Sequence, residues 1–298
     1  MHVRLFAAVT AITCLAAVLP ARAASPAERL SPVRLDYTIY AGGLEAMSLA
    51  LRVRTDANGY LLQTRVRTIG FLSRVVPFVL EAATEGVHDG DALVPRSYAT
   101  ANRWRSKDIR RVDMQYRDGV VPDVTAVPEP EDDDRKRVPR DRRRETVDPL
   151  TAVFRLLLAG PGTCRGQAAV FDGRRRYDMT AERVGKTAVD SGDYGIYRGE
   201  ATQCRLGVET ITGFWNDVEE RKRYPEAVKL WLGDAVEGGP PVPVRLEIDT
   251  DYVTVVGHLT QVRRGEAASL TPTPTPTPLD VIARSSGATD DEVVQDAR

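Results

Sequence analysis

Alternation of apolar and polar side chains is the feature that most restricts the fold of this chain. It recurs in six stretches, at residues 35–39, 49–53, 62–68, 112–116, 177–179 and 244–248. A period of two places one apolar face inward and one polar face outward, as in an antiparallel sheet wetted on one side. Turn dipeptides separate the stretches: Asn58-Gly59, Asp89-Gly90, Asp118-Gly119 and Asp172-Gly173. The pattern predicts a mainly β protein, a curved antiparallel sheet or half-barrel wrapped around one or two helices.

One helix is clearly indicated between the β stretches. Asp148 is a favourable N-cap and Pro149 suits the first helical position. An apolar stripe at helical spacing follows and ends before Gly160; it consists of Leu150, Val153, Phe154 and Leu157. A second, weaker helix candidate covers residues 71–80, which are largely apolar but interrupted by Pro77. We expect this second segment to plug the sheet, with a lid over a cavity as the alternative.

The N-terminus has the three parts of a secretory signal peptide. Arg4 is followed by an apolar run over residues 5–19 and by the small-residue cleavage site Ala21-Arg22-Ala23. The run is shorter than the roughly 20 residues that cross a bilayer, which argues against a membrane anchor. Lipidation at Cys14 is a less favoured alternative. We therefore predict that residues 1–23 are removed after Ala23, leaving an exported chain with no transmembrane segment.

Two cysteines, Cys164 and Cys204, remain after that cleavage. An even pair in an oxidising compartment predicts a disulfide, and closing a loop of roughly 40 residues is worth about 4 kcal/mol. A redox pair and a metal site are the alternatives. Redox pairs usually lie closer in sequence, and a metal needs three or four ligands, whereas His88 and His258 are the remaining histidines. We expect no bound metal.

The predicted mature chain divides into a domain and a tail. Residues 24–264 form a single β-rich domain, and residues 265–298, with their Thr-Pro repeat and acidic end, are expected to be a disordered tail or a spacer. A charged loop is inserted at residues 128–145, where acidic 129–134 precedes basic 135–144. We expect this loop to be solvated, with contact to anionic lipid as the alternative. Cleavage removes two of 41 basic side chains and none of 42 acidic ones, so nothing favours nucleic acid.

Motifs of known enzyme classes are missing from the sequence. It contains no G-x-S-x-G elbow, no H-E-x-x-H helix and no phosphate loop with its lysine. We therefore expect no catalytic residues, no cofactor and no enzymatic activity. Arg174, Arg175 and Arg176 follow the Asp172-Gly173 turn and are candidate contacts for an anion, although a plain hairpin turn is the favoured interpretation.

Several short motifs together resemble a family of exported bacterial proteins, domain of unknown function 3108. They include Leu35-Asp36-Tyr37, Gly42-Gly43, Thr68-Ile69-Gly70, residues 93–98, Asp148-Pro149-Leu150-Thr151-Ala152 and residues 171–178, with the two cysteines around the last two. The resemblance extends from about residue 35 to about residue 264. It implies a periplasmic protein of the Gram-negative cell envelope, and it brings no catalytic residues.

The leading functional hypothesis is a non-enzymatic periplasmic protein that binds a lipid or another amphiphile. A bent sheet around a helix is similar to the periplasmic lipoprotein-carrier fold, which is an analogy of fold alone. The side chains expected to line a cavity are Leu62, Val66, Met114, Phe154 and Leu157. An envelope scaffold that binds a protein partner is the first alternative, and a wall or glycan hydrolase with a carboxylate pair is the second.

Overall fold

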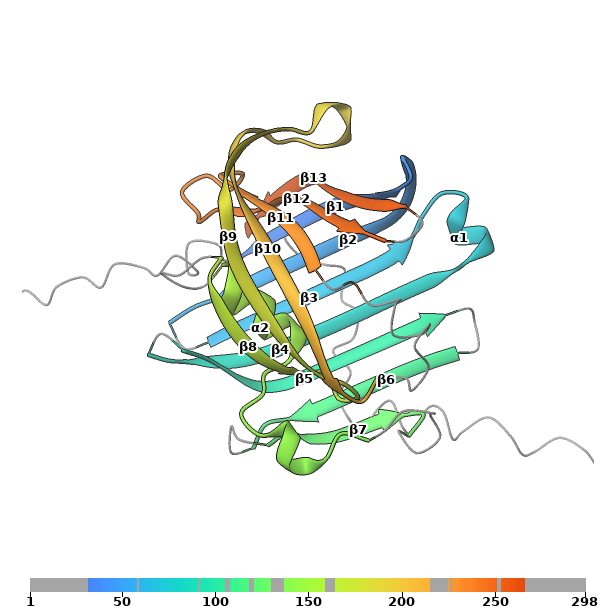
Figure 1. Cartoon of the computed structure of the whole chain (residues 1–298), viewed down its shortest axis with the longest axis vertical. Coiled ribbons are helices and arrows are strands. Elements are labelled where there is room, and N and C mark those ends of the chain that lie inside the picture. The colour runs from blue at the N-terminus through green and yellow to red at the C-terminus, as the bar shows by residue number, and fades with distance from the viewer. Residues whose placement is uncertain are drawn as a thin grey trace, which may run out of the picture.

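A computed structural model describes residues 32–57, 59–90, 92–104, 108–117, 121–129, 137–158, 164–214, 225, 227–250 and 253–265. The described chain forms one antiparallel sheet of thirteen strands (Figure 1). The strands are β1 (Val33–Ala41), β2 (Leu44–Thr55), β3 (Gly59–Thr68), β4 (Phe78–Asp89), β5 (Ala92–Trp104), β6 (Asp108–Gln115), β7 (Asp123–Val127), β8 (Gly166–Phe171), β9 (Arg176–Asp190), β10 (Arg198–Thr212), β11 (Ala227–Gly233), β12 (Val242–Asp249) and β13 (Thr254–Arg264). The helices are α1 (Leu72–Val75) and α2 (Pro149–Leu157), with 3-10 turns η3 (Arg140–Arg143) and η4 (Gly192–Tyr194).

The sheet consists of two meanders, β1 to β7 and β8 to β13, which are joined where β1 pairs with β13. The order is β7-β6-β5-β4-β3-β2-β1-β13-β12-β11-β10-β9-β8, so consecutive strands are neighbours except where β1 pairs with β13. The edges β7 and β8 flank α2 in the sequence, and the sheet is not closed by strand pairing between them. The predicted curved antiparallel sheet is confirmed. Two predicted turns lie at hairpin ends, with Gly90 and Gly173 at positive φ.

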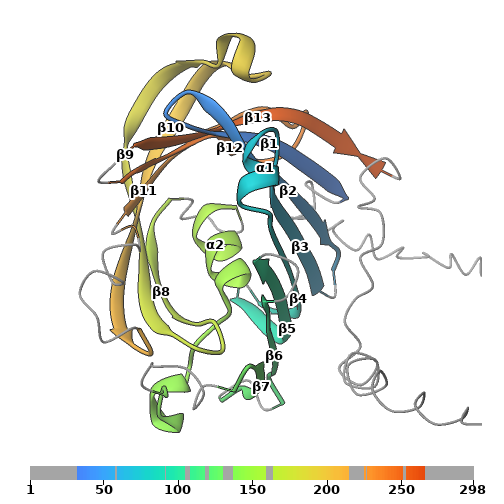
Figure 2. The same ribbon diagram turned by 90° about the vertical axis from the view of Figure 1, so that its right-hand side faces the viewer.

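Helix α2 lies inside the curve of the sheet (Figure 2). The sequence predicts one apolar stripe, but the helix is buried over a wider arc, because strands of both meanders surround it. Its buried side chains are Thr151, Ala152, Phe154, Leu156 and Leu157. Arg155 is exposed. The helix therefore belongs to the main core of the domain.

A buried carboxylate fixes the start of α2 to the sheet. Asp148 is fully buried, and its Oδ1 accepts the backbone N–H groups of Leu150 and Thr151 at 3.0 Å each. Its Oδ2 accepts the Thr151 hydroxyl at 2.5 Å and lies 2.9 Å from the Thr84 hydroxyl on β4. The Tyr60 hydroxyl on β3 lies 2.9 Å from Thr151 Oγ1. The predicted cap is confirmed, and it also connects the helix to two strands.

The two sheet edges meet through side chains near the β8–β9 turn. A Cβ atom at Gly173 would lie 2.0 Å from Cγ1 of Val112 on β6, so the turn contacts the opposite meander directly. Phe171 is buried in a second core cluster with Met114 and Val138. The Arg174 Nη2 atom donates to the carbonyl oxygen of Pro128 at 2.5 Å. The half-barrel is therefore held together at this corner without a strand-to-strand ladder.

The structure corrects the prediction for residues 71–80. Helix α1 is four residues long and has no buried residue, and Phe78 already starts β4. A plug inside the sheet is therefore wrong. Pro77 prevents helix continuation, and the consecutive apolar residues Phe78, Val79 and Leu80 that follow it begin a strand.

Other predicted segments fall partly or wholly outside the described residues. The signal peptide and residues 266–298 of the predicted tail lie outside them. Of the charged loop, residues 137–145 are described, and they contribute the buried Val138 to the second core cluster. In the described part of the chain, no helix is long and apolar enough to cross a membrane.

Candidate functional site

The inner face of the first meander is aligned in rows across its strands. One row next to α2 contains Val33, Val53, Leu62 and Thr84, which are direct partners in register. Each of these side chains is at most 2% exposed. Val33, Val53 and Leu62 of this row belong to the main core together with α2.

Farther along the same strands, most apolar side chains of this face are only half-buried, and the polar Thr64 and Thr68 lie among them. The half-buried apolar side chains of this region, here called the inner floor, are Met47, Leu49, Leu51, Val66, Phe78, Leu80 and Ala82. Register places Leu49, Val66 and Leu80 side by side on β2, β3 and β4. The inner floor is thus a largely apolar surface on the concave side of the sheet, with Leu49, Val66 and Leu80 as its continuous row.

The length of α2 explains why the inner floor is only partly covered: Leu49 and Leu51 pack against the main core and Ala82 against the second cluster. A nine-residue helix is about 14 Å long, whereas a ten-residue strand such as β3 extends for about 33 Å. In Figure 1, α2 and α1 lie toward opposite ends of strands β2 to β5. Helix α2 therefore covers one end of the concave face, and α1 contributes no buried side chain at the other end.

Polar side chains border the inner floor on the β5 and β6 side. Asn102 lies opposite Leu80, and Arg110 lies opposite Asn102, so both share the face of the inner floor. Both are half-buried. An apolar surface with a polar border matches a ligand that has one apolar and one polar part.

The structure places the five predicted cavity residues in three locations. Leu62, Phe154 and Leu157 belong to the main core beneath α2, and Met114 belongs to the second cluster. Val66 is on the inner floor. The sequence analysis does not include Phe78 and Leu80 among the cavity residues, because the apolar run around Pro77 is interpreted there as helical.

A separate pair of adjoining cavities lies between β7, the 137–143 segment and the β8–β9 turn. Their volumes are about 200 Å³ and 410 Å³, and both are lined by Val124, Arg137, Val138 and Arg143. Arg143 donates from Nε and Nη2 to the Val138 carbonyl oxygen at 2.9 and 2.7 Å. Burial and the nearby Arg137 and Arg140 guanidinium groups lower the pKa of Arg143.

The three predicted anion contacts, Arg174, Arg175 and Arg176, have different partners in the structure. Arg174 lines the smaller cavity together with Glu129. Arg175 is bound to Asp172 at 2.6 Å, and Arg176 is bound to Asp178 at 2.7 Å. Arg174 donates to the Pro128 carbonyl oxygen. Binding of an anion by these three arginines stays a prediction.

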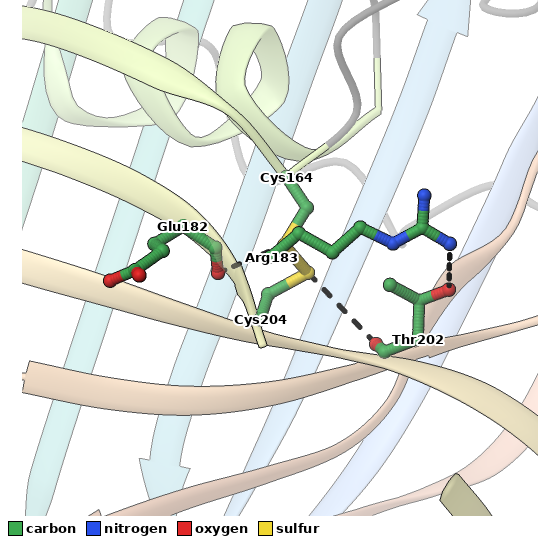
Figure 3. The surroundings of a disulfide bond; sticks show 5 residues. All are labelled: Cys164, Glu182, Arg183, Thr202 and Cys204. Atoms are coloured by element: carbon green, nitrogen blue, oxygen red, sulfur yellow. Dashed lines mark hydrogen bonds between the residues drawn. A yellow bond between two sulfur atoms is a disulfide. The ribbon is translucent and has the colours of Figure 1, made fainter. Parts of the chain in front are cut away.

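The predicted disulfide is present between Cys164 and Cys204 (Figure 3). The two Cα atoms are 5.8 Å apart and both residues are fully buried. Cys164 follows α2 and precedes β8, while Cys204 lies within β10. The bond therefore ties the segment after the helix to the second meander, as Asp148 ties its start to the first.

The histidines have ordinary protein contacts. His88 Nε2 lies 3.1 Å from the Thr55 hydroxyl, and the His258 ring stacks on Tyr194 at a centroid distance of 5.8 Å. Burial, followed by the charge of Arg245, lowers the pKa of His258. Within the described ranges, no three His, Cys, Asp or Glu side chains gather closely enough to hold a metal ion.

Comparison with known proteins gives one match. The model of a family described as "Protein of unknown function (DUF3108)" matches residues 36–260. No curated protein and no solved structure matches the chain. The match covers most of the chain and includes the inner floor, α2 and both cysteines. The chain therefore belongs to the DUF3108 family of proteins of unknown function.

Proposed function

We propose that this protein is a non-enzymatic periplasmic protein that binds an amphiphile along its inner floor. The observation that carries the proposal is the row of Leu49, Val66 and Leu80, which is apolar and only half-buried across β2, β3 and β4. A soluble domain rarely leaves a contiguous apolar surface without a use for it. An acyl chain lying along the floor would remove this surface from water.

The polar border supports an amphiphile over a purely apolar ligand. An acyl chain along Leu49, Val66 and Leu80 would place its polar end toward Asn102 and Arg110, which share the same face. The predicted signal peptide supports a periplasmic location, where amphiphiles of the cell envelope are available. The fixed position of α2 leaves the floor preformed, which lowers the entropic cost of binding.

The direct test is binding of a fluorescent polyene fatty acid to the purified mature protein. Val66→Asp places a carboxylate in the middle of the inner floor, and we expect it to weaken probe binding by about tenfold or more, equivalent to at least ~1.4 kcal/mol. Ala82→Trp fills the floor while keeping it apolar, and we expect a similar loss. Circular dichroism and thermal unfolding verify that each variant is folded.

The matched control is Ser48→Asp on the outward face at the same level of the sheet. Ser48 pairs in register with Arg67, so the new carboxylate faces a cation and solvent. We expect unchanged probe affinity. Equal affinity in the wild type, Val66→Asp and Ala82→Trp proteins would reject the inner floor as the binding site.

A further inference from the structure

Large apolar side chains are exposed at the open end of the inner floor. Phe71 is 78% exposed, Val75 is 53% exposed and Trp104 is 47% exposed. Phe71 and Val75 are four residues apart around α1, a spacing that places two side chains on one helix face. Together with Arg74 and Arg103, these three residues are called the rim.

The rim continues directly into the inner floor. The Trp104 and Phe78 rings are partners in register, with centroids 5.5 Å apart in an edge-to-face arrangement. Phe78 belongs to the inner floor and shares its strand face with Leu80. An apolar path therefore leads from the exposed rim to the half-buried surface proposed for the amphiphile.

The charge at this end of the sheet is mainly positive. Arg67, Arg74 and Arg103 are exposed among the described residues at the ends of β2 to β5, where Glu45 is an exposed acid. Arg67 donates to the neutral Ser48 hydroxyl at 3.2 Å. Aromatic side chains favour the membrane–water interface, and arginines near it are attracted to anionic lipid headgroups.

We propose that the rim docks on an anionic membrane surface, where an amphiphile passes between the bilayer and the inner floor. This inference rests on the proposed function, because the rim is the open end of that site. Phe71, Val75 and Trp104 enter the headgroup region, and Arg74 and Arg103 pair with lipid phosphates. Positive charge around the apolar side chains favours a membrane over a second copy of the chain, whose rim would carry the same charge.

The test is co-flotation of the mature protein with vesicles of phosphatidylethanolamine and phosphatidylglycerol. We expect Phe71→Ser/Val75→Ser to reduce vesicle binding by about tenfold or more, because both apolar insertions are lost. The matched control, Val184→Ser/Ile196→Ser, removes two exposed apolar side chains from the β9–β10 hairpin and should bind like the wild type. Equal binding of the rim variant, the control and the wild type would overturn the proposal.

Two measurements distinguish insertion of the apolar rim side chains into the membrane from electrostatic attraction of the rim arginines to lipid phosphates. Arg74→Gln/Arg103→Gln should abolish the preference for phosphatidylglycerol over phosphatidylcholine vesicles and reduce the sensitivity to salt. Trp104 emission should shift to shorter wavelength on vesicles, and Trp104→Phe should lack that shift. An emission maximum that stays constant on vesicles, or concentration-dependent dimerisation that the rim variant abolishes, would contradict membrane docking.

The fatty-acid probe, measured without vesicles, keeps the two proposals distinguishable. Rim variants should retain the wild-type affinity for the probe. If the wild-type protein binds the probe normally but does not bind vesicles, the rim is rejected as a docking surface and the inner floor is retained as the amphiphile site. Vesicle binding without any probe binding supports the rim as a docking surface and rejects the inner floor as the amphiphile site.

Discussion

Replacing Asp148 with alanine is expected to lower the free energy of unfolding by about 3 to 5 kcal/mol, more than a surface substitution costs. The alanine removes the helix cap and leaves the buried hydroxyls of Thr84 and Thr151 without their shared acceptor. Chemical denaturation of the wild type and the variant measures the difference.

Asp148→Asn is the matched control, because its side-chain oxygen can still cap α2. We expect a smaller loss than in the alanine variant. If the alanine variant loses less than about 1 kcal/mol in free energy of unfolding, Asp148 does not hold α2 against the sheet as described.

The free energy of unfolding should also depend on pH through the charge state of Asp148. Burial raises its pKa and the hydrogen bonds from Thr151, Thr84 and Leu150 only partly oppose this, so the net shift is upward. An acid with a raised pKa binds its proton more tightly in the folded state. Its contribution to stability is complete below the unfolded pKa and is lost as pH rises through the folded pKa. The Asn variant should lack this component of the pH profile.

Removing the disulfide is expected to lower the free energy of unfolding by an amount comparable to that of Asp148→Ala. The Cys164→Ala/Cys204→Ala variant should lose about 4 kcal/mol, because the bond closes a loop of sequence separation 40 and restricts the unfolded chain. For a domain of this size, that loss lowers the thermal midpoint by about 8 to 16 °C. Thermal unfolding of the oxidised wild type and the double variant measures the shift.

Reductant provides the control for this experiment. Wild-type protein that is unfolded, reduced and refolded under reducing conditions should have the midpoint of the double variant. Because both sulfurs are buried, brief exposure of the folded protein to mild reductant should leave the midpoint unchanged. A difference below about 1 kcal/mol between oxidised wild type and double variant would contradict a stabilising disulfide.

Local sequence signals predicted the parts of the fold that depend on neighbours in the chain. Alternation located six of the thirteen strands, namely β1, β2, β3, β6, β9 and β12. Asp148 and Pro149 located the start of α2, and the even cysteine count predicted the Cys164–Cys204 bond. Each of these signals acts over a few residues or through a single covalent rule, so a single sequence is sufficient to recognise it.

The candidate site depends on long-range register, which the sequence does not show. The inner floor exists because Leu49, Val66 and Leu80 align across three strands and because α2 is too short to bury them fully. Residues 78–80 were misassigned since a short apolar run after a proline fits a helix or a strand. The rim was missed because exposure of Phe71 and Trp104 depends on where the curved sheet ends.

Native mass spectrometry of the mature protein, purified from a bacterial periplasm without detergent, tests amphiphile binding most directly. We expect the wild-type protein to carry a reproducible added mass that is released on denaturation and identified as an amphiphile. The Val66→Asp variant should lack this added mass. A wild-type spectrum with the apo mass alone, unchanged after a fatty acid is added in excess, would contradict amphiphile binding.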